Sequence, residues 1–210
     1  MPSFFIKHVR GWRVVALAAV SIAYGVLILM VLPFWGRMVE AQGGVELQTR
    51  FSYTHTAARS ALYALKAEAP RDALIFYALD VPNALLYGSA MAAMIAFGLR
   101  RLHWEDTPLK WLILTPFLSS AADIAENACL AYAVMHKPAQ LRYMLAGMAL
   151  ITTAKFATGI AAQGLAILAT FTGLVLYGLR VLTGRSFAPG KRTRRRREPR
   201  ESYSDTRPWS

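Results

Sequence analysis

Three acidic side chains lie within stretches of the sequence that are otherwise apolar. Asp80 falls in one such stretch, and Asp123 and Glu126 fall in the next. A carboxylate in the middle of a membrane span costs roughly 3 kcal/mol or more, and it is retained mainly where it faces a bundle interior and has a role there. Such a group could hold a cationic headgroup, transfer a proton, or join helices through hydrogen bonds. These carboxylates are the first candidates for chemistry.

Other polar residues accompany the carboxylates at helical spacing. Residues three and four apart share one face of a helix, which places Asn127 beside Asp123 and Glu126, and Asn83 beside Asp80. A lysine and a glutamine share a face of the last apolar stretch. The sequence therefore predicts a ligand-binding cluster of Asp80, Asn83, Asp123, Glu126, Asn127, Lys155 and Gln163.

The apolar stretches are the elements that must position this cluster. With 55% hydrophobic and 17% charged residues among 210, the chain is too apolar for an ordinary soluble domain. Its four apolar blocks each reach the roughly 20 residues that cross a bilayer, and they lack the alternation of barrel strands. We predict an all-α membrane helix bundle within residues 1–183, with about four transmembrane helices near 14–35, 73–99, 109–135 and 156–182.

The first block also has features of a secretory signal. Lys7, Arg10 and Arg13 precede it, and Val39-Glu40-Ala41 after it resembles a signal-peptidase site. Its apolar run of about 22 residues exceeds the roughly 7 to 15 of a typical signal. We therefore predict an uncleaved anchor.

The distribution of lysine and arginine predicts the orientation. Positive charge gathers before the first block, between Arg100 and Lys110, and after Leu182, and cytoplasmic segments retain such charge. This predicts a multi-pass protein of the bacterial cytoplasmic membrane with both termini inside and loop 36–72 outside. Counting a rise of 1.5 Å per residue from the inner anchors places the carboxylates roughly 20 to 30 Å above the inner surface. The cluster is then expected in the outer half of the membrane, open to the outside.

Two outer segments have less certain roles in the sequence. The fourth block is about 40 residues long, so residues 143–157 could form an outer extension, a kinked segment or a helix on the membrane surface. Thr54 to Glu68 has the composition of an amphipathic helix, which could cover the cluster.

The C-terminal segment 184–210 is a basic tail. Seven of the ten residues from Lys191 to Arg200 are basic, and few aliphatic residues accompany them, which predicts disorder. A basic segment next to a span typically contacts anionic lipid headgroups, so we expect membrane lipids rather than nucleic acid as its partners. The sequence has one cysteine and no nucleotide, zinc or hydrolase signature, and it predicts no cofactor and no metal.

A family resemblance is carried by three patterns. They are Ala57-Ala-Arg-Ser-Ala-Leu-Tyr-Ala-Leu65, Asp80-x-x-Asn-x-x-x-Tyr-Gly88, and Pro116-Phe-Leu followed by Asp123-x-x-Glu-Asn127. Over about residues 12–177 the chain resembles a group of uncharacterised four-helix membrane proteins of bacteria and some eukaryotes. The resemblance implies a membrane location and carries no activity. A weaker likeness to the four-helix sterol isomerases concerns architecture alone.

Several functions fit these features. The leading prediction is the binding of a lipid or an amphiphilic small molecule at the cluster. One alternative is an enzyme of lipid or isoprenoid chemistry with Glu126 or Asp123 as general acid or base, and another is a structural or assembly protein whose carboxylates only pack helices. Proton or cation transport ranks last, because Met91 to Leu99 offer no polar path.

Overall fold

The structure is a computed structural model that describes residues 2–44, 49, 54–136 and 142–183. These residues are helical and contain no strand, which confirms the all-α prediction. The helices are α1 (Pro2–His8), α2 (Gly11–Val26), α3 (Pro33–Ala41), α4 (His55–Glu68), α5 (Pro70–Leu102), α6 (Thr115–Met135) and α7 (Arg142–Thr183), with a π-helical segment η1 (Leu27–Val31) and a 3-10 helix η3 (Pro108–Leu114). The predicted disordered tail lies outside the described residues.

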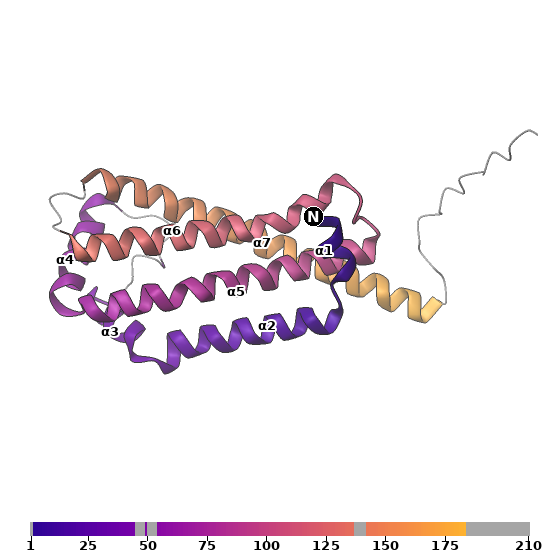
Figure 1. Cartoon of the computed structure of the whole chain (residues 1–210), viewed down its shortest axis with the longest axis horizontal. Helices are drawn as coiled ribbons and strands as arrows, with labels where there is room; N and C mark the ends of the chain where they lie inside the picture. The colour runs from indigo at the N-terminus through magenta and orange to yellow at the C-terminus, as the bar shows by residue number, and fades with distance from the viewer. Residues whose placement is uncertain (1, 45–48, 50–53, 137–141, 184–210) are drawn as a thin grey trace, which may run out of the picture.

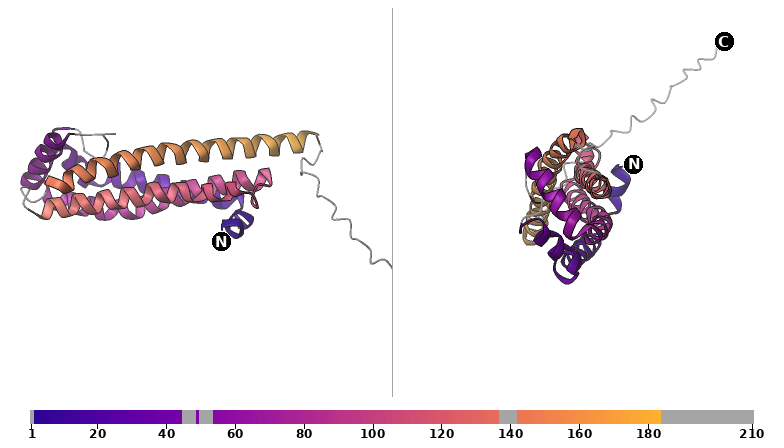
Figure 2. Two further views of the ribbon diagram at one scale, coloured as in Figure 1. Left: turned by 90° about the horizontal axis from the view of Figure 1, so that it is seen from above. Right: turned by 90° about the vertical axis from the view of Figure 1, so that its left-hand side faces the viewer.

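The long helices form a bundle around α5. α2, α6 and α7 all pack against α5, and α6 and α7 also pack against each other (Figure 1). α3 and α4 lie at one end of the bundle, and α1 and η3 lie at the other. α7 runs beside α5 and α6 and extends past them at the end that carries the N-terminus (Figure 2).

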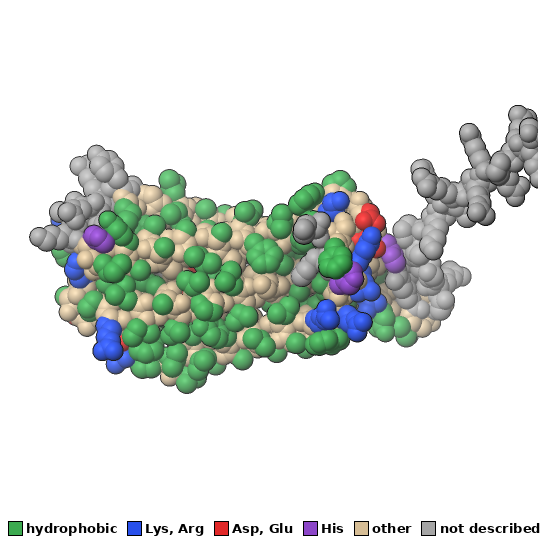
Figure 3. Space-filling model, viewed as in Figure 1, with side chains coloured by type: hydrophobic (Ala, Val, Ile, Leu, Met, Phe, Trp, Pro, Cys, Tyr) green, Lys and Arg blue, Asp and Glu red, His purple; other side chains and the backbone are tan. Residues whose placement is uncertain are grey.

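Three helical segments are long and apolar enough to cross a membrane: Gly11–Val31, Pro70–Leu102 and Gly147–Thr183. Figure 3 shows hydrophobic side chains along the length of one face, with Lys and Arg side chains gathered at its two ends. This distribution is typical of a protein embedded in a bilayer. The chain is therefore a membrane protein with at least three candidate spans. α6 is not among them, because its carboxylates, amide and hydroxyls lower the hydropathy of a 21-residue helix.

The ends of two helices follow from particular residues. The first membrane segment ends at Leu32, which is extended because Pro33 disfavours the helical conformation in the residue before it. α5 ends at His103, whose φ of 60° lies in the left-handed region. The Trp104 N–H then bonds the Leu99 carbonyl at 2.9 Å, as in common C-terminal caps.

Glycines allow α5 to approach its neighbours closely. A Cβ atom at Gly98 would overlap the backbone of Ala169 in α7, and one at Gly88 would overlap the Ser120 hydroxyl in α6. Small residues at such crossings are the usual means by which membrane helices pack without a side-chain layer between them. These contacts hold α6 close to the middle of α5 and α7 close to its C-terminal part.

The two less certain outer segments are both helical. Residues 142–183 form one continuous helix, so the stretch before Lys155 extends α7 rather than forming a separate surface helix. α4 occupies the predicted amphipathic segment, and Thr54 caps it by accepting the Ala57 N–H at 3.2 Å. Its buried side chains, Ala58 and Leu62 among them, face the bundle.

Two layers of buried apolar side chains lie along the bundle. The layer near α4, which we call the α4-side layer, includes Leu62, Phe76, Leu130, Leu145 and Met148. The layer near α1, the α1-side layer, includes Ile6, Val14, Ile95, Leu99 and Ile113. Along α5, α6 and α7, the predicted polar cluster falls between these two layers.

Candidate functional site

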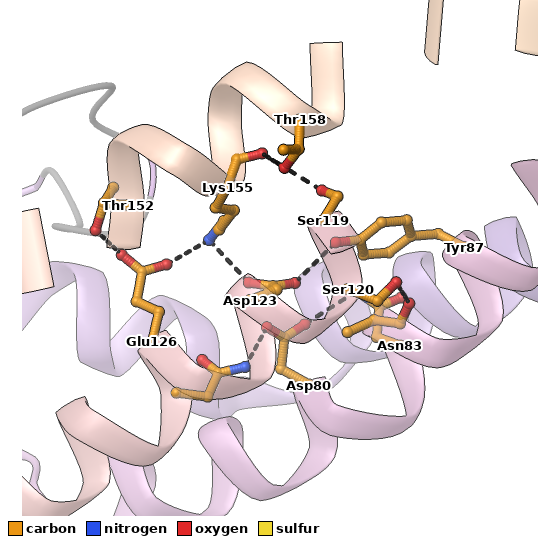
Figure 4. Close-up of polar contacts among 12 residues, drawn as sticks. Asp80, Asn83, Tyr87, Ser119, Ser120, Asp123, Glu126, Thr152, Lys155 and Thr158 are labelled. Carbon is orange, nitrogen blue, oxygen red and sulfur yellow. Dashed lines mark hydrogen bonds and ion pairs between the residues drawn. The ribbon is translucent and has the colours of Figure 1, made fainter. Parts of the chain in front are cut away.

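The three carboxylates of the cluster are buried in the bundle interior. Asp80 is 8% exposed, Asp123 is 5% exposed and Glu126 is fully buried. Asp80 comes from α5, while Asp123 and Glu126 come from adjacent turns of α6 and point toward α7 (Figure 4). Along the bundle the carboxylates lie between the α4-side and α1-side layers, so apolar side chains of the α4-side layer stand between the cluster and α4; the opening of the cluster to the outside stays a prediction.

Lys155 of α7 turns inward and joins two of these carboxylates. Its Nζ atom lies 2.6 Å from Glu126 Oε2 and 2.8 Å from Asp123 Oδ1. The structure shows that this lysine points into the bundle, as its predicted place in the cluster requires (Figure 4). One ammonium group therefore bridges two acidic residues one turn apart on α6.

Thr152 completes the environment of Glu126. It is fully buried, and its hydroxyl donates to Glu126 Oε1 as well as lying 3.0 Å from the Met148 carbonyl. Sequence reasoning misses Thr152, because the sequence leaves the path of residues 143–157 open. Its place three residues before Lys155 is the signal that could have found it, since that spacing puts both on one helical face.

Asp80 is held by amides rather than by a cation. Its Oδ2 accepts the Nδ2–H of Asn127 at 2.9 Å, and its Oδ1 accepts the Nδ2–H of Asn83 at 3.0 Å. Asn83 belongs to the same helix, one turn later, whereas Asn127 reaches across from α6. The two hydrogen bonds orient both oxygens but supply no positive charge.

Hydroxyl groups complete the network at the α5–α6 contact. Tyr87 donates to Asp123 Oδ2 at 3.2 Å, so Asp123 contacts both α5 and α7. The Ser120 hydroxyl lies 2.6 Å from the Ala84 carbonyl, and Ser119 lies 3.4 Å from the Lys155 carbonyl. The cluster thus joins all three helices through side chains of each.

Gln163 is the one predicted site residue that the structure leaves outside the cluster. Its side chain is exposed, while Ala162 and Ala166 of the same helix are buried. Eight residues separate it from Lys155, which corresponds to a rotation of about 80° past two full turns. The inward face of α7 runs through Thr152, Lys155 and Ala162 instead.

The charges of the cluster do not balance when all of its groups are ionised. Three carboxylates face one lysine, which leaves two negative charges in excess. A charge in a poorly polarisable interior is costly unless an opposite charge or hydrogen bonds compensate it. Lys155 compensates Asp123 and Glu126 in part, whereas Asp80 relies on two amides and interacts with Lys155 only at longer range. The excess charge is centred on the Asp80 side of the cluster.

The cavities of the described part of the chain lie away from the cluster residues. Three cavities in the described part of the chain are lined by other residues: one beside Arg100, one beside Gln42 and one beside Leu102. Among the described residues, no group of three His, Cys, Asp or Glu side chains is arranged to hold a metal ion.

Comparison with known proteins adds no functional information: no family model, curated protein or solved structure matches this chain. The interpretation of the cluster therefore depends on its geometry and charge.

Proposed function

We propose that the protein has four membrane spans, with α6 as the span added to the three apolar segments. The exposed side chains of α6 are apolar and include Leu118, Tyr132 and Met135, whereas its carboxylates are buried. A helix that turns its polar face to the bundle and its apolar face to lipid can cross a bilayer even if its mean hydropathy is lower than that of a wholly apolar span. Four spans place the N-terminus and the end of α7 on the same side.

Both termini then lie in the cytoplasm, and the membrane is the bacterial cytoplasmic membrane. α1, η3 and the C-terminal end of α7 share one end of the bundle (Figure 1). Lys7, Arg10, Arg100 and Arg101 belong to that end. Short basic segments are retained on the cytoplasmic side, which supports this orientation.

The proposed function is the binding of an amphiphile with a basic headgroup at the carboxylate cluster. The observation that carries the proposal is the excess of carboxylates over lysine in a buried cluster. Among the described residues, Lys155 is the one basic side chain paired with these carboxylates. A cationic headgroup beside Asp80 and Asp123 would neutralise the negative charge that Lys155 leaves uncompensated.

A ligand that arrives from the bilayer fits this cluster better than an ion that arrives from water. The α4-side and α1-side layers cover the two ends of the cluster with apolar side chains. The approach we propose is lateral, beside α2, which packs mainly on α5 and covers the half-buried Asn83: a Cβ at Gly25 would be 3.6 Å from Asn83 Oδ1. Proton or cation conduction would require a continuous polar path through the bundle, and the stretch from Met91 to Leu99 of α5 is apolar.

The experiment is a comparison of three probes with one chain length and different headgroups. Dodecylamine, dodecanol and dodecanoate are titrated into the purified full chain in a neutral detergent, and the thermal unfolding temperature is measured. We expect only dodecylamine to raise the unfolding temperature, because only it supplies positive charge. Asp80→Asn should remove the effect, and Thr158→Val, whose hydroxyl contacts only α7 carbonyls, serves as the matched control. Equal shifts with all three probes would contradict the proposal.

A structural role is the second candidate, and the closure of the network favours it. Glu126 bonds Thr152 and Lys155, and Asp80 accepts hydrogen bonds from two asparagines, so these carboxylates bind protein groups in the present conformation. Interhelical hydrogen bonds in membranes contribute roughly 0.6 to 2 kcal/mol each. If no amine probe binds and cluster variants only lose stability, this second function replaces the first.

A further inference from the structure

A cavity of about 400 Å³ opens at the N-terminal end of the bundle, far from the carboxylate cluster along α5. Its walls come from the α1–α2 junction, the last turns of α5 and the segment that follows α5. The polar lining residues are Arg10, Arg100, Arg101, His103 and Glu105. Three arginines converge on one cavity of a size that accommodates a small ligand or headgroup.

Two of these arginines are held in place. Arg100 Nη1 donates to the Val9 carbonyl at 2.5 Å, which ties the end of α5 to the α1–α2 junction. The guanidinium carbon of Arg101 lies 5.1 Å from the Phe97 ring centre and 4.6 Å from the Tyr177 ring centre. These ring contacts hold the Arg101 guanidinium at the wall of the cavity. The cavity therefore has fixed donors suited to a phosphate or carboxylate.

Glu105 introduces the opposite charge into the same cavity. Its Oε2 atom is buried and has no hydrogen-bond partner among the described residues, and no ion pair of Glu105 occurs there either. A buried carboxylate oxygen without a donor is costly, and such atoms are rare in folded proteins. A simple anion would leave this oxygen unsatisfied and would be repelled by it, whereas a ligand with an N–H donor would satisfy it.

We propose that this cavity binds a group that carries both a phosphate and a primary ammonium. The phosphate lies against the arginines and the ammonium donates to Glu105. The headgroup of an ethanolamine phospholipid has this chemistry, and so does soluble phosphoethanolamine. The cavity lies where α2 begins and α5 ends, at the basic end of the bundle, which corresponds to the level of lipid headgroups in the proposed orientation.

The test measures adducts by native mass spectrometry on the full chain released from detergent micelles. The probes are phospholipids with the same acyl chains and ethanolamine, choline or glycerol headgroups, and soluble phosphoethanolamine is tested separately. The variants are Arg10→Gln and Glu105→Gln. Arg13→Gln is the matched control. It removes the same charge only three residues after Arg10, at a residue that does not line the cavity.

Three results are expected if the assignment is right. The ethanolamine lipid binds at least about tenfold more tightly than the choline lipid, because a quaternary ammonium has no N–H to donate to Glu105. Arg10→Gln weakens it about tenfold, and Arg13→Gln leaves it unchanged. Glu105→Gln removes the preference for ethanolamine and does not weaken the glycerol lipid, which lacks an amine.

The soluble probe identifies the source of the ligand. Binding of phosphoethanolamine with the same dependence on Arg10 and Glu105 assigns the cavity to a soluble aminophosphate, and binding of the lipid alone assigns it to the bilayer. Equal adducts for all three lipids, or equal loss in Arg10→Gln and Arg13→Gln, would overturn the proposal. If Arg10→Gln does not fold, the Glu105→Gln variant alone tests the proposal: it supports the proposal if the preference for the ethanolamine lipid is lost and overturns it if that preference remains. Asp80→Asn should leave these adducts unchanged, so this inference stands or falls separately from the function of the carboxylate cluster.

Discussion

Lys155 Nζ lies 2.6 Å from Glu126 Oε2 in the interior of the bundle, and this pair joins α7 to α6 where both helices are covered by other side chains. The same ammonium lies 2.8 Å from Asp123 Oδ1. A single lysine thus holds two acidic residues of the neighbouring helix.

Removal of the lysine is expected to be strongly destabilising. Lys155→Met leaves Asp123 and Glu126 buried without their cation, and breaking such a pair typically costs roughly 3 to 5 kcal/mol. The free energy of unfolding in mixed micelles measures the loss. Lys155→Met/Glu126→Gln should recover part of it, because one uncompensated charge is removed. Lys7→Met breaks an exposed ion pair with Asp106 and should cost no more than about 1 kcal/mol. A Lys155→Met protein as stable as the wild type would show that the pair has no energetic role.

The Thr152 hydroxyl should matter more than an ordinary helix threonine. Thr152→Val keeps the shape of the side chain and leaves Glu126 Oε1 without its donor, which we expect to cost roughly 1 to 3 kcal/mol. Thr158→Val is the matched control, because the Thr158 hydroxyl lies against the Ala154 and Lys155 carbonyls of its own helix. Unfolding of both variants under identical conditions gives the comparison. Equal losses would mean that the bond to Glu126 adds nothing.

Close packing between α5 and α7 depends on Gly98. Gly98→Ala places a Cβ atom onto the backbone of Ala169, so the helices must separate, at a cost of about 1 to 3 kcal/mol. Gly164→Ala in α7 meets nothing within 4 Å and should be neutral or slightly stabilising, since alanine favours helix over glycine. Thermal unfolding distinguishes the two. A neutral Gly98→Ala would contradict the described helix crossing.

The two ends of α6 should be accessible from opposite sides of the membrane. In a Cys129→Ala background, which removes the one native cysteine, His136→Cys and Lys110→Cys place single thiols near the two ends of this helix. A membrane-impermeant maleimide should label His136→Cys in intact spheroplasts and Lys110→Cys only after lysis. Labelling of both thiols before lysis would exclude α6 as a span in the proposed orientation.

Much of the cluster could be predicted from the sequence, because helical spacing depends only on the order of the residues. Asp123, Glu126 and Asn127 were expected on one face, and all three are buried on the inward side of α6. Asp80 and Asn83 were expected together, and they are hydrogen bonded. The four-helix family resemblance stays a prediction.

Other features depend on how helices pack, which the sequence does not state. The sequence predicts Gln163 in the cluster with Lys155. Eight residues of α-helix turn the side-chain direction by two full turns and about 80° more, so Gln163 points outward. Thr152 shares a helical face with Lys155 only if the helix extends back past residue 152, and the sequence alone does not show that α7 begins at Arg142. Leu62, Leu130 and Met148 meet in the α4-side layer, a contact between separate helices that helical spacing cannot show. The opening of the cluster to the outside stays a prediction.

Photolabelling locates a bound amphiphile directly, by showing which segments of the chain lie beside its amine. A dodecylamine that carries a diazirine near its amine is irradiated with the full chain in micelles, and the labelled peptides are mapped. The account predicts labelling of segments around residues 22–27 and 79–87, competition by unlabelled dodecylamine but not by dodecanol, and loss of this labelling in Asp80→Asn. Labelling spread over the exposed apolar face of α7, without competition and unchanged in Asp80→Asn, would contradict it.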